Sequence, residues 1–479
     1  MGSGTIWASV LNGGKQAGMD DLIVIGGGLA GCEAAWQAAE RGLSVSLFEM
    51  RPDHPTGAHV TSDLAELVCS NSLGSHSTQR ASGLLKEELR LMGSLLLACA
   101  EETAVPAGGS LAVDRGAFAS LVTERIQNHP NITLIREEVT FIPTGPVIVA
   151  SGPLTSAALA QSIQDLTGQE NLFFFDAIAP IVRGETIDLS IAFRGTRYGM
   201  EEGKPGDYIN CPMSREEYDH FIQELIHAER IPLRSFEQQI AEGVTAGAHQ
   251  FFEGCLPVEI LAARENQALA YGPMRPVGLT NSHNNQRYPA VVQLRQDNLA
   301  GTLYNMVGFQ TNLTYAEQKR VFRMIPGLEK AEFERYGQMH RNTFIAAPLV
   351  LKPTLQMRSY DNLFFAGQIV GVEGYLGNIA TGLLAGLNAS RLMRGQSPCT
   401  LPRTTMLGGL LQYITQAELK DFQPMKANFG ILPPLPSPAR FKPERGAQYA
   451  QRALADLSTW AQRVGFSLQE QLPDQETKL

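Results

Sequence analysis

Three glycines near the start of the chain have the spacing of a dinucleotide-binding turn. Gly26, Gly28 and Gly31 give the pattern Gly-x-Gly-x-x-Gly. The first glycine permits a tight turn, the second lets the backbone approach a pyrophosphate, and the third lets a helix pack close to a strand. Glu49 follows 18 residues after Gly31 and is an acid that can accept hydrogen bonds from an adenosine ribose. These residues predict a dinucleotide site and leave FAD and NAD open.

A second glycine-punctuated stretch lies far along the chain, from Asn362 to Ser390. An apolar run, Leu363 to Ala366, leads into Gly367, and a long helix is expected from Asn378 to Leu392. A helix that begins after such a turn directs its N-terminal amides toward the oxygen edge of a flavin ring. Two units of this kind on either side of an insertion favour FAD over NAD.

The six cysteines are scattered and form no Cys-x-x-Cys pair. This argues against a disulfide framework, a zinc site and a disulfide-reductase centre, and we expect no metal. Cys69 stands beside three small polar residues, Ser70 to Ser72, and Cys255 lies in a Gly-Cys-Leu-Pro turn. A single cysteine is most often a small buried hydrophobic residue. The polar neighbours of Cys69, soon after the glycine turn, favour a site instead.

The elements that must position these groups begin with a βαβ unit. Leu22 to Ile25 is an apolar run, the alanine-rich segment after Gly28 suits a tightly packed helix that ends at Gly42, and Leu43 to Phe48 reads as a second strand. Further along we expect a helix from Ala81 to Cys99, a helix from Asp114 to Ile126 capped by Asp114, and strands at Ile132–Phe141 and Val147–Ala150.

The composition changes between about Tyr198 and Gln338, where Ser214 to Ala228 has the pattern of a helix with a capping box formed by Ser214 and Glu217. We therefore expect an α/β protein, with a Rossmann-like two-dinucleotide FAD-binding domain and an inserted α+β domain. The expected parts are a tag or leader at 1–18, the first FAD-binding part at 19–200, the inserted substrate domain at 201–338, and the second FAD-binding part with a C-terminal segment at 339–479.

The bulk properties limit the classes of function. The chain has 479 residues, and its formal net charge of −9 argues against a generally basic nucleic-acid binder, although a local basic patch remains compatible with it. No apolar run is long enough to span a bilayer, so we expect no membrane contact. The unpaired cysteines point to a reducing cytoplasm.

Ten stretches of the chain together resemble the bacterial folate- and FAD-dependent tRNA (uracil-54-C5) methyltransferases. They are IGGGLAGCEAAWQ, FEMRP, AELVCSNSL, VPAGGSLAVDR, SGPLTS, FEGCLPVE, MHRNTF, AGQIVGVEGY, ATGLLAGLNA and FQPMKANFG. They run in the family's order from Asp21 to about Trp460. The glycine loop is shared with the related GidA family of wobble-uridine modification proteins, whereas the phrases around Cys69 and Cys255 are particular to the methyltransferases.

The resemblance implies methylation of C5 of uridine-54 in the tRNA T loop. In this reaction 5,10-methylenetetrahydrofolate gives its methylene to reduced flavin, and a cysteine thiolate attacks uracil C6, which makes C5 nucleophilic. C5 takes the carbon, loses its proton, and the adduct is reduced to methyl, so FADH2 serves as methylene carrier and reductant. NADPH or NADH recharges the flavin. The implied partner is the T arm of tRNA, and the inserted domain is then a substrate or tRNA domain.

The resemblance also assigns roles to residues. Cys255 matches the better candidate for the C6 nucleophile, and Cys69 matches a cysteine that assists, as a base or as a protecting partner of the activated flavin. His340 is the motif-consistent choice for stacking on the folate pteridine. The implied cofactor contacts are Gly26, Gly27, Gly28, Leu29, Ala30, Gly31, Glu49, Met50, Arg51, Gly367, Gln368, Tyr375, Ala380 and Thr381.

The chain departs from the family pattern at a few positions, and alternatives remain. Gly377 and Asn378 stand where glutamate and serine are usual, which puts those flavin contacts in doubt, and Arg275 stands where lysine is common. A histidine such as His340 is as often a satisfied core residue. The alternative functions are a flavin-dependent NAD(P)H oxidoreductase without RNA, a wobble-uridine tRNA modification protein, and an RNA-binding partner with a structural FAD. The paired cysteine phrases favour the methyltransferase.

Overall fold

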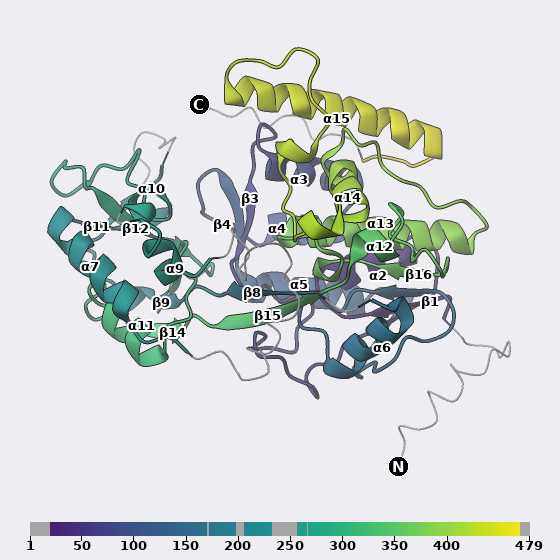
Figure 1. Ribbon diagram of the computed structural model, residues 1–479, viewed down its shortest axis with the longest axis horizontal. Helices are drawn as coiled ribbons and strands as arrows, with labels where there is room; N and C mark the ends of the chain where they lie inside the picture. Colours follow the sequence, from purple (N-terminus) through teal and green to yellow (C-terminus); the bar gives the residue numbers. More distant parts are fainter. Residues whose placement is uncertain (1–19, 170–171, 198–205, 232–255, 266, 470–479) are drawn as a thin grey trace.

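The computed structural model describes residues 20–169, 172–197, 206–231, 256–265 and 267–469. Figure 1 shows a larger part, which contains the first and last stretches of the described chain, and a smaller part built from the teal middle of the sequence. A pair of long strands joins the two parts. The expected leader at 1–18 lies outside the described residues.

The larger part is built on a five-stranded parallel sheet in the order β16-β7-β1-β2-β6. Its strands are β1 (Leu22–Ile25), β2 (Val45–Phe48), β6 (Ile132–Ile135), β7 (Val147–Val149) and β16 (Leu363–Phe365). Strands buried on both faces of a parallel sheet need continuous apolar sequence, which is the pattern these segments carry. The strands β1 and β16, the first and last of this sheet along the chain, both pair with β7. The C-terminal segment therefore completes a sheet that the N-terminal segment began.

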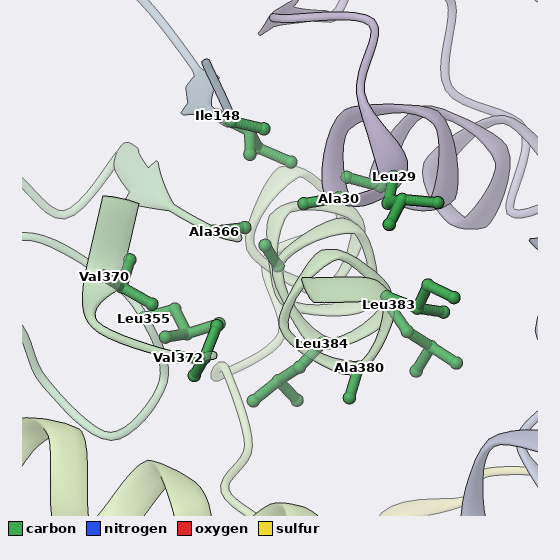
Figure 2. Close-up of a cluster of buried hydrophobic side chains, with 14 of the residues drawn as sticks. Leu29, Ala30, Ile148, Leu355, Ala366, Val370, Val372, Ala380, Leu383 and Leu384 are labelled. Atoms are coloured by element: carbon green, nitrogen blue, oxygen red, sulfur yellow. The ribbon is translucent and has the colours of Figure 1, made fainter. Parts of the chain in front are cut away.

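Two glycine-containing helices pack closely on this sheet, α2 (Leu29–Ala39) and α13 (Tyr375–Met393). A Cβ atom added at Gly382 would lie 2.3 Å from the carbonyl oxygen of Ala30, so the backbones of the two helices touch at this point. Figure 2 shows apolar side chains from both helices in this region, among them Leu29 and Ala30 from α2 and Leu383 from α13. The close contact fixes the glycine turn before α2 relative to the start of α13.

The prediction of a single helix from Ala81 to Cys99 is wrong, because the helix is broken. The segment from Ala81 to Cys99 forms two helices, α3 (Ala81–Leu91) and α4 (Leu95–Glu102). Gly93 between them has φ of +76°, a conformation that ends a helix, and the hydroxyl of Ser94 accepts the N–H of Leu97 at 3.2 Å as a new N-cap. The leucine repeat continued across the break and concealed it.

The helix expected after Asp114 is confirmed. It is α5 (Arg115–Gln127), and the carboxylate of Asp114 accepts the N–H of Ala117 at 2.9 Å. The strand expected at Ile132–Phe141 is shorter, because only β6 pairs with the sheet. Beside these elements lies a small antiparallel sheet in the order β3-β5-β4, made of β3 (Ser72–Ser75), β4 (Ala104–Val105) and β5 (Ser110–Val113).

The smaller part is an antiparallel sheet with helices on one face and its own apolar core. The sheet order is β10-β11-β12-β13-β9-β14, with β9 (Ile181–Arg183), β10 (Phe193–Gly195), β11 (Tyr208–Met213), β12 (Ala290–Gln296), β13 (Leu303–Met306) and β14 (Phe333–Arg335). The sheet therefore begins upstream of residue 201. The domain boundary expected at that residue stays a prediction.

The helices of the smaller part are α7 (Arg215–His227), α9 (Val258–Ala262), α10 (Ala268–Tyr271) and α11 (Tyr315–Phe322). The capping box predicted for the first of them is confirmed, since Ser214 accepts from the N–H of Glu217 and the Glu217 carboxylate accepts from the N–H of Ser214. Such reciprocal bonds satisfy two donors that a helix start otherwise leaves open.

The two parts are joined by β8 (Leu172–Ala177) and β15 (Met339–Phe344), which pair antiparallel along their whole length. The remaining helices of the larger part are α6 (Ala157–Thr167), α12 (Ala347–Val350), α14 (Met406–Gln416) and α15 (Lys442–Val464), with short 3₁₀ turns at Gly184–Thr186, Gln368–Val370, Leu419–Asp421 and Phe429–Ile431. In the described ranges, no helix combines the length and the apolar character that crossing a membrane requires.

Candidate functional site

Two connected cavities lie at the carboxyl ends of β1, β2, β7 and β16, the edge where open α/β sheets bind ligands. We call the first the glycine groove, because Gly26, Gly28 and Gly367 line it, and the second the Cys69 pocket. The Cys69 pocket has a volume of about 270 Å³. The two cavities share six lining residues: Val68, Pro153, Leu154, Gln368, Tyr375 and Asn378. A ligand in the groove can therefore reach the pocket.

Most of the expected cofactor residues lie together in the glycine groove. Its lining contains Gly26, Gly28, Leu29, Ala30, Glu49, Met50, Arg51, Gly367, Gln368 and Tyr375. Four expected residues do not line it: Gly27, Gly31, Ala380 and Thr381. The hydroxyl of Thr381 accepts the N–H of Gly367 at 2.9 Å, and Ala380 is buried in the core, so both support the groove from behind.

The glycine turn fits the approach of a pyrophosphate. Gly26 has φ of +106°, and a Cβ there would lie 2.5 Å from the carbonyl oxygen of Ala150. A Cβ at Gly31 would lie 1.8 Å from the carbonyl oxygen of Gly26, so only glycine lets α2 start here. A Cβ at Gly28 meets nothing within 4 Å, which leaves its backbone open to the groove. These are the three uses of glycine that the motif predicts.

Glu49 is an ionised acid held at the end of β2. Its Oε1 accepts from Arg51 Nε at 2.9 Å and from Arg51 N at 3.0 Å, and its Oε2 accepts from Gly27 N at 2.9 Å. Burial raises the pKa of Glu49, but the hydrogen bonds and charge of Arg51 outweigh it and hold the pKa below its usual value. Because Oε2 has only one of these donors, it keeps a lone pair for a ribose hydroxyl.

Asn378 in the first turn of α13 carries a buried side-chain oxygen that accepts no hydrogen bond within the described chain. Its amide nitrogen donates to the carbonyl of Gly374 at 3.2 Å. The residue lines both cavities, and an unsatisfied buried acceptor costs free energy unless a ligand supplies a donor. Asn378, which stands where serine is usual in the family, therefore still fits a polar cofactor.

The loop that carries Cys69 is held by Tyr375 from α13. The Tyr375 hydroxyl accepts the N–H of Cys69 at 3.0 Å and the N–H of Ser70 at 2.9 Å, although Cys69 and Tyr375 are 306 positions apart. The Sγ of Cys69 faces the carbonyl oxygen of Ala177 at 4.0 Å, at the end of β8. The thiol therefore lies where the glycine groove, α13 and the connecting strands meet.

Two arginines hold the same loop from other elements. Arg115 of α5 donates to the carbonyl oxygens of Leu67 at 2.6 Å and Cys69 at 3.3 Å, and it forms an ion pair with Asp297 at 2.9 Å. Asp297 directly follows β12 of the smaller part. Arg115 and Asp297 are both distant from this loop in sequence.

Arg295 of β12 provides the second contact from the smaller part. Its Nε donates to Asn71 Oδ1 at 2.7 Å and its Nη2 donates to Ser70 Oγ at 2.8 Å. Asn71 in turn donates to the carbonyl oxygens of Val113 and Gln296, both at 2.9 Å. The polar residues that made Cys69 a candidate are thus the anchors of its loop.

Two arginines lie close enough to Cys69 to interact with its charge. A negatively charged Cys69 interacts favourably with Arg115 and Arg335, and it contributes to raising the pKa of both. For Arg115 burial lowers the pKa, but the charge and hydrogen bond of Asp297, together with the charges of Tyr375 and Cys69, outweigh burial and raise it. For Arg335 burial keeps the pKa below its usual value. Burial, and then the charge of Cys69, raise the pKa of Tyr375, so this phenol stays neutral and can donate its proton in a hydrogen bond.

Cys69 differs from the other cysteines that the structure describes. Cys32, Cys99, Cys211 and Cys399 are buried, whereas Cys69 is partly exposed. Burial raises the pKa of each of these four thiols, that of Cys99 to about 12, and a thiol of that kind is inert. Cys255 lies outside the described residues. His340 belongs to β15 and pairs with Asp176, but its side chain also lies outside them.

Several lining residues were not predicted from the sequence. In the glycine groove, Thr56 and His59 share a 2.6 Å hydrogen bond, and burial lowers the pKa of His59 to about 4, so that it is neutral. In the Cys69 pocket the additional polar residues are Gln310, Asn342, Glu373 and Lys426. The Ser-Gly-Pro turn after β7 was the available signal for the 151–154 segment, which lines both cavities. The other residues carry no local pattern.

The fold and the groove define a Rossmann-like dinucleotide-binding protein. A family model described as "Glucose inhibited division protein A" matches residues 21–397. Among solved structures, the Aquifex aeolicus GidA in its form I crystal has a TM-score of 0.65 at 18% identity, covering 93% of this chain and 76% of that chain. The form II crystal gives a TM-score of 0.60. The expected fold class is confirmed.

Full-length relatives define the family more narrowly. Proteins named methylenetetrahydrofolate--tRNA-(uracil-5-)-methyltransferase TrmFO match this chain at 55% identity in Desulforudis audaxviator, over 93% of this chain and 99% of the relative. The relative from Bacillus pumilus is 52% identical over 91% and 98%, and the one from Geobacter sulfurreducens 53% identical over 92% and 99%. The chain belongs to the TrmFO family, which is related to GidA.

Proposed function

We propose that the protein methylates C5 of uridine-54 in the T loop of tRNA, with 5,10-methylenetetrahydrofolate as the carbon donor. The observation that carries the proposal is the identity of more than half the residues to relatives named as methylenetetrahydrofolate-dependent tRNA (uracil-5-) methyltransferases, over nearly their whole length. The enzyme class follows from this match. The uridine position and the reaction path are our proposal, supported by the Cys69 pocket and its thiol.

FAD is the cofactor that fits the glycine groove. The open backbone of Gly28 and the amides that start α2 would bind the pyrophosphate, and Glu49 would accept from the ribose. Asn378 would accept a hydrogen bond with its unpaired oxygen, near the N-terminus of α13. When bound and reduced, the flavin supplies the methylene carrier and the electrons that convert methylene to methyl. Oxidised cofactor would be recharged by NADPH or NADH.

The cysteines would activate the uracil ring. A thiolate that adds to C6 pushes electron density to C5, and when C5 has taken the carbon and lost its proton, the C6–S bond breaks and the thiolate leaves. We assign the addition to Cys255 and the proton removal to Cys69, whose surroundings of Arg115 and Arg335 favour a negatively charged sulfur. The alternative role for Cys69 is to protect the activated flavin.

The remaining assignments extend the same proposal. His340 would stack on the pteridine of the folate, since its strand leads into the Cys69 pocket through Asn342. The T arm of tRNA would bind across the pocket, between the larger part and the inserted sheet. A tRNA-modifying enzyme of this kind would act in the cytoplasm.

The proposal is tested by incubating the flavin-loaded protein with unmodified tRNA transcript, methylenetetrahydrofolate and NADPH, followed by nucleoside analysis of the RNA. We expect 5-methyluridine from the wild type and none from Cys255→Ala, which should keep its yellow flavin absorbance. A flavin-loaded wild type that forms no product would exclude the methyltransferase and favour an NAD(P)H oxidoreductase. Loss of flavin from Cys255→Ala would instead make this cysteine structural.

A further inference from the structure

A column of three aromatic rings lies on the smaller part and takes no role in the proposed chemistry. The ring of Phe333 on β14 stacks on Tyr336 with centroids 5.4 Å apart and planes at 28°. Tyr336 stacks on Tyr315, the first residue of α11, at 5.1 Å and 23°. Tyr315 ends the column with 45% of its surface exposed. Because Tyr336 covers one face of the Tyr315 ring, the opposite face is the one on which a ligand could stack.

The rings are held in place by hydrogen bonds around Gly337. The buried side chain of Gln318 donates to the carbonyl oxygen of Gly337 at 2.9 Å and accepts the N–H of the same residue at 2.7 Å. The side chain of Gln338 donates to the hydroxyl of Tyr315. A rigid aromatic face loses little conformational entropy when it binds a ligand.

The column adjoins the Cys69 pocket. The N–H of Ile178, which lines the pocket, donates to the carbonyl oxygen of Gln338 at 2.8 Å. Arg335, between the first two rings in sequence, interacts electrostatically with Cys69 and donates to the carbonyl oxygen of Ala58, another lining residue. One short segment, 335–338, therefore connects the exposed ring to the site of the thiol.

An exposed lysine lies beside the exposed ring. Lys319 lies one helical turn after Tyr315, on the same face of α11, is exposed and makes no ion pair within the described ranges. The nearby carboxylates of Glu224 and Glu317 both form ion pairs with Arg320, and neither of them pairs with Lys319. An exposed ring next to an unpaired cation matches the two components of single-stranded nucleic acid, a base and a phosphate.

We propose that Tyr315, supported by Tyr336 and Phe333, is a stacking platform for an unpaired base of the tRNA substrate, with Lys319 on an adjoining phosphate. This inference rests on the proposed function and adds a recognition surface outside the reaction centre. Aromatic side chains that stack on splayed bases are the usual means of gripping RNA loops, and they tolerate sequence change because every base has a π face.

The test measures binding of a labelled hairpin with the T-arm sequence by fluorescence anisotropy, using flavin-loaded protein. Tyr315→Ala should weaken binding about tenfold, in keeping with the effect of removing one stacked ring, and Tyr315→Leu should do the same. Tyr315→Phe keeps the ring and should bind like the wild type. Tyr360→Ala is the matched control, since Tyr360 is 48% exposed on the larger part, and it should also bind like the wild type.

Lys319→Gln tests the phosphate contact. It should weaken binding and reduce the slope of log affinity against log salt by about one, as the loss of one phosphate contact does. Normal hairpin binding by Tyr315→Ala and Tyr315→Leu, with intact flavin absorbance, would overturn the platform. A loss in Tyr315→Phe equal to that in Tyr315→Ala would also overturn it, because the hydroxyl and not the ring would then act.

Methylation of full tRNA by the wild type separates this inference from the proposed function. Product formation together with normal binding by Tyr315→Ala would reject the platform and leave the function standing. Hairpin binding that depends on the Tyr315 ring, without any 5-methyluridine, would support the platform and reject the function. A wild type that does not bind the hairpin but binds a protein through this surface would reject the platform in favour of a protein partner.

Discussion

At the scale of single residues, the buried ion pair between Arg115 and Asp297 is the strongest link between the Cys69 loop and the smaller part. Their side chains are only 13% and 4% exposed, and Arg115 also holds two carbonyl oxygens of the loop. Removal of one member of a buried pair leaves the other charge buried without a partner. The resulting loss of folding free energy is larger than the net stabilisation that the pair provides.

Asp297→Ala should therefore lower the free energy of unfolding by about 3 kcal/mol. The matched control is Asp219→Ala, which removes an exposed partner from Arg215, where the side chains are 48% and 43% exposed, and it should cost less than about 1 kcal/mol. Denaturant unfolding followed by tryptophan fluorescence measures both. Equal effects of the two substitutions would show that the Arg115–Asp297 pair does not anchor the loop.

At the scale of elements, α3 accepts the first two N–H groups of α14 across a long stretch of sequence, beside the N-cap that Thr405 provides. Glu88 of α3 is fully buried, and its carboxyl accepts the N–H of Met406 at 2.6 Å and the N–H of Leu407 at 2.9 Å. Burial raises the pKa of Glu88 to about 7, although these two hydrogen bonds lower it. The folded protein therefore holds this proton to a higher pH than the unfolded chain, whose carboxyl has a pKa of 4.5.

A raised pKa gives stability that is present below about pH 4.5 and is lost as the pH rises through about 7. Glu88→Gln is neutral at every pH, so its stability relative to the wild type should increase between pH 5 and 8, by at most about 3 kcal/mol. Denaturant unfolding of both proteins at several pH values measures the difference. Parallel pH curves would mean that Glu88 titrates normally in the folded state.

Local patterns predicted those elements whose signals are themselves local. The cap at Asp114 and the capping box at Ser214 follow from hydrogen bonds between residues a few positions apart, and Gly31 is required by the close approach of the Gly26 carbonyl oxygen in the same turn. The helix break at Gly93 was not predicted, although its signal is local too. Its signal, a glycine followed by Ser94, was present in the sequence, but the leucine repeat on either side favoured one continuous helix.

At the scale of the whole molecule, the site is assembled from segments that no local pattern could join. The sequence identified Cys69 and Tyr375 separately, but only the fold brings the tyrosine hydroxyl to the cysteine loop. Arg115 ends the stretch VPAGGSLAVDR, and Arg295 and Asp297 had no motif of their own. The role of all three could not be predicted, because they hold carbonyl oxygens and side chains that are distant in sequence. Resemblance to a family supplied the chemistry, and the fold supplied its geometry.

The central claim is that the carbon added to the tRNA comes from folate, and isotope tracing tests it most directly. The flavin-loaded protein is incubated with unmodified tRNA, NADPH and methylenetetrahydrofolate labelled with ¹³C in its methylene group, and the T-loop fragment is analysed by mass spectrometry. We predict 5-methyluridine at position 54 with the label in its methyl group. An unlabelled methyl group, or product that requires S-adenosylmethionine, would contradict the account.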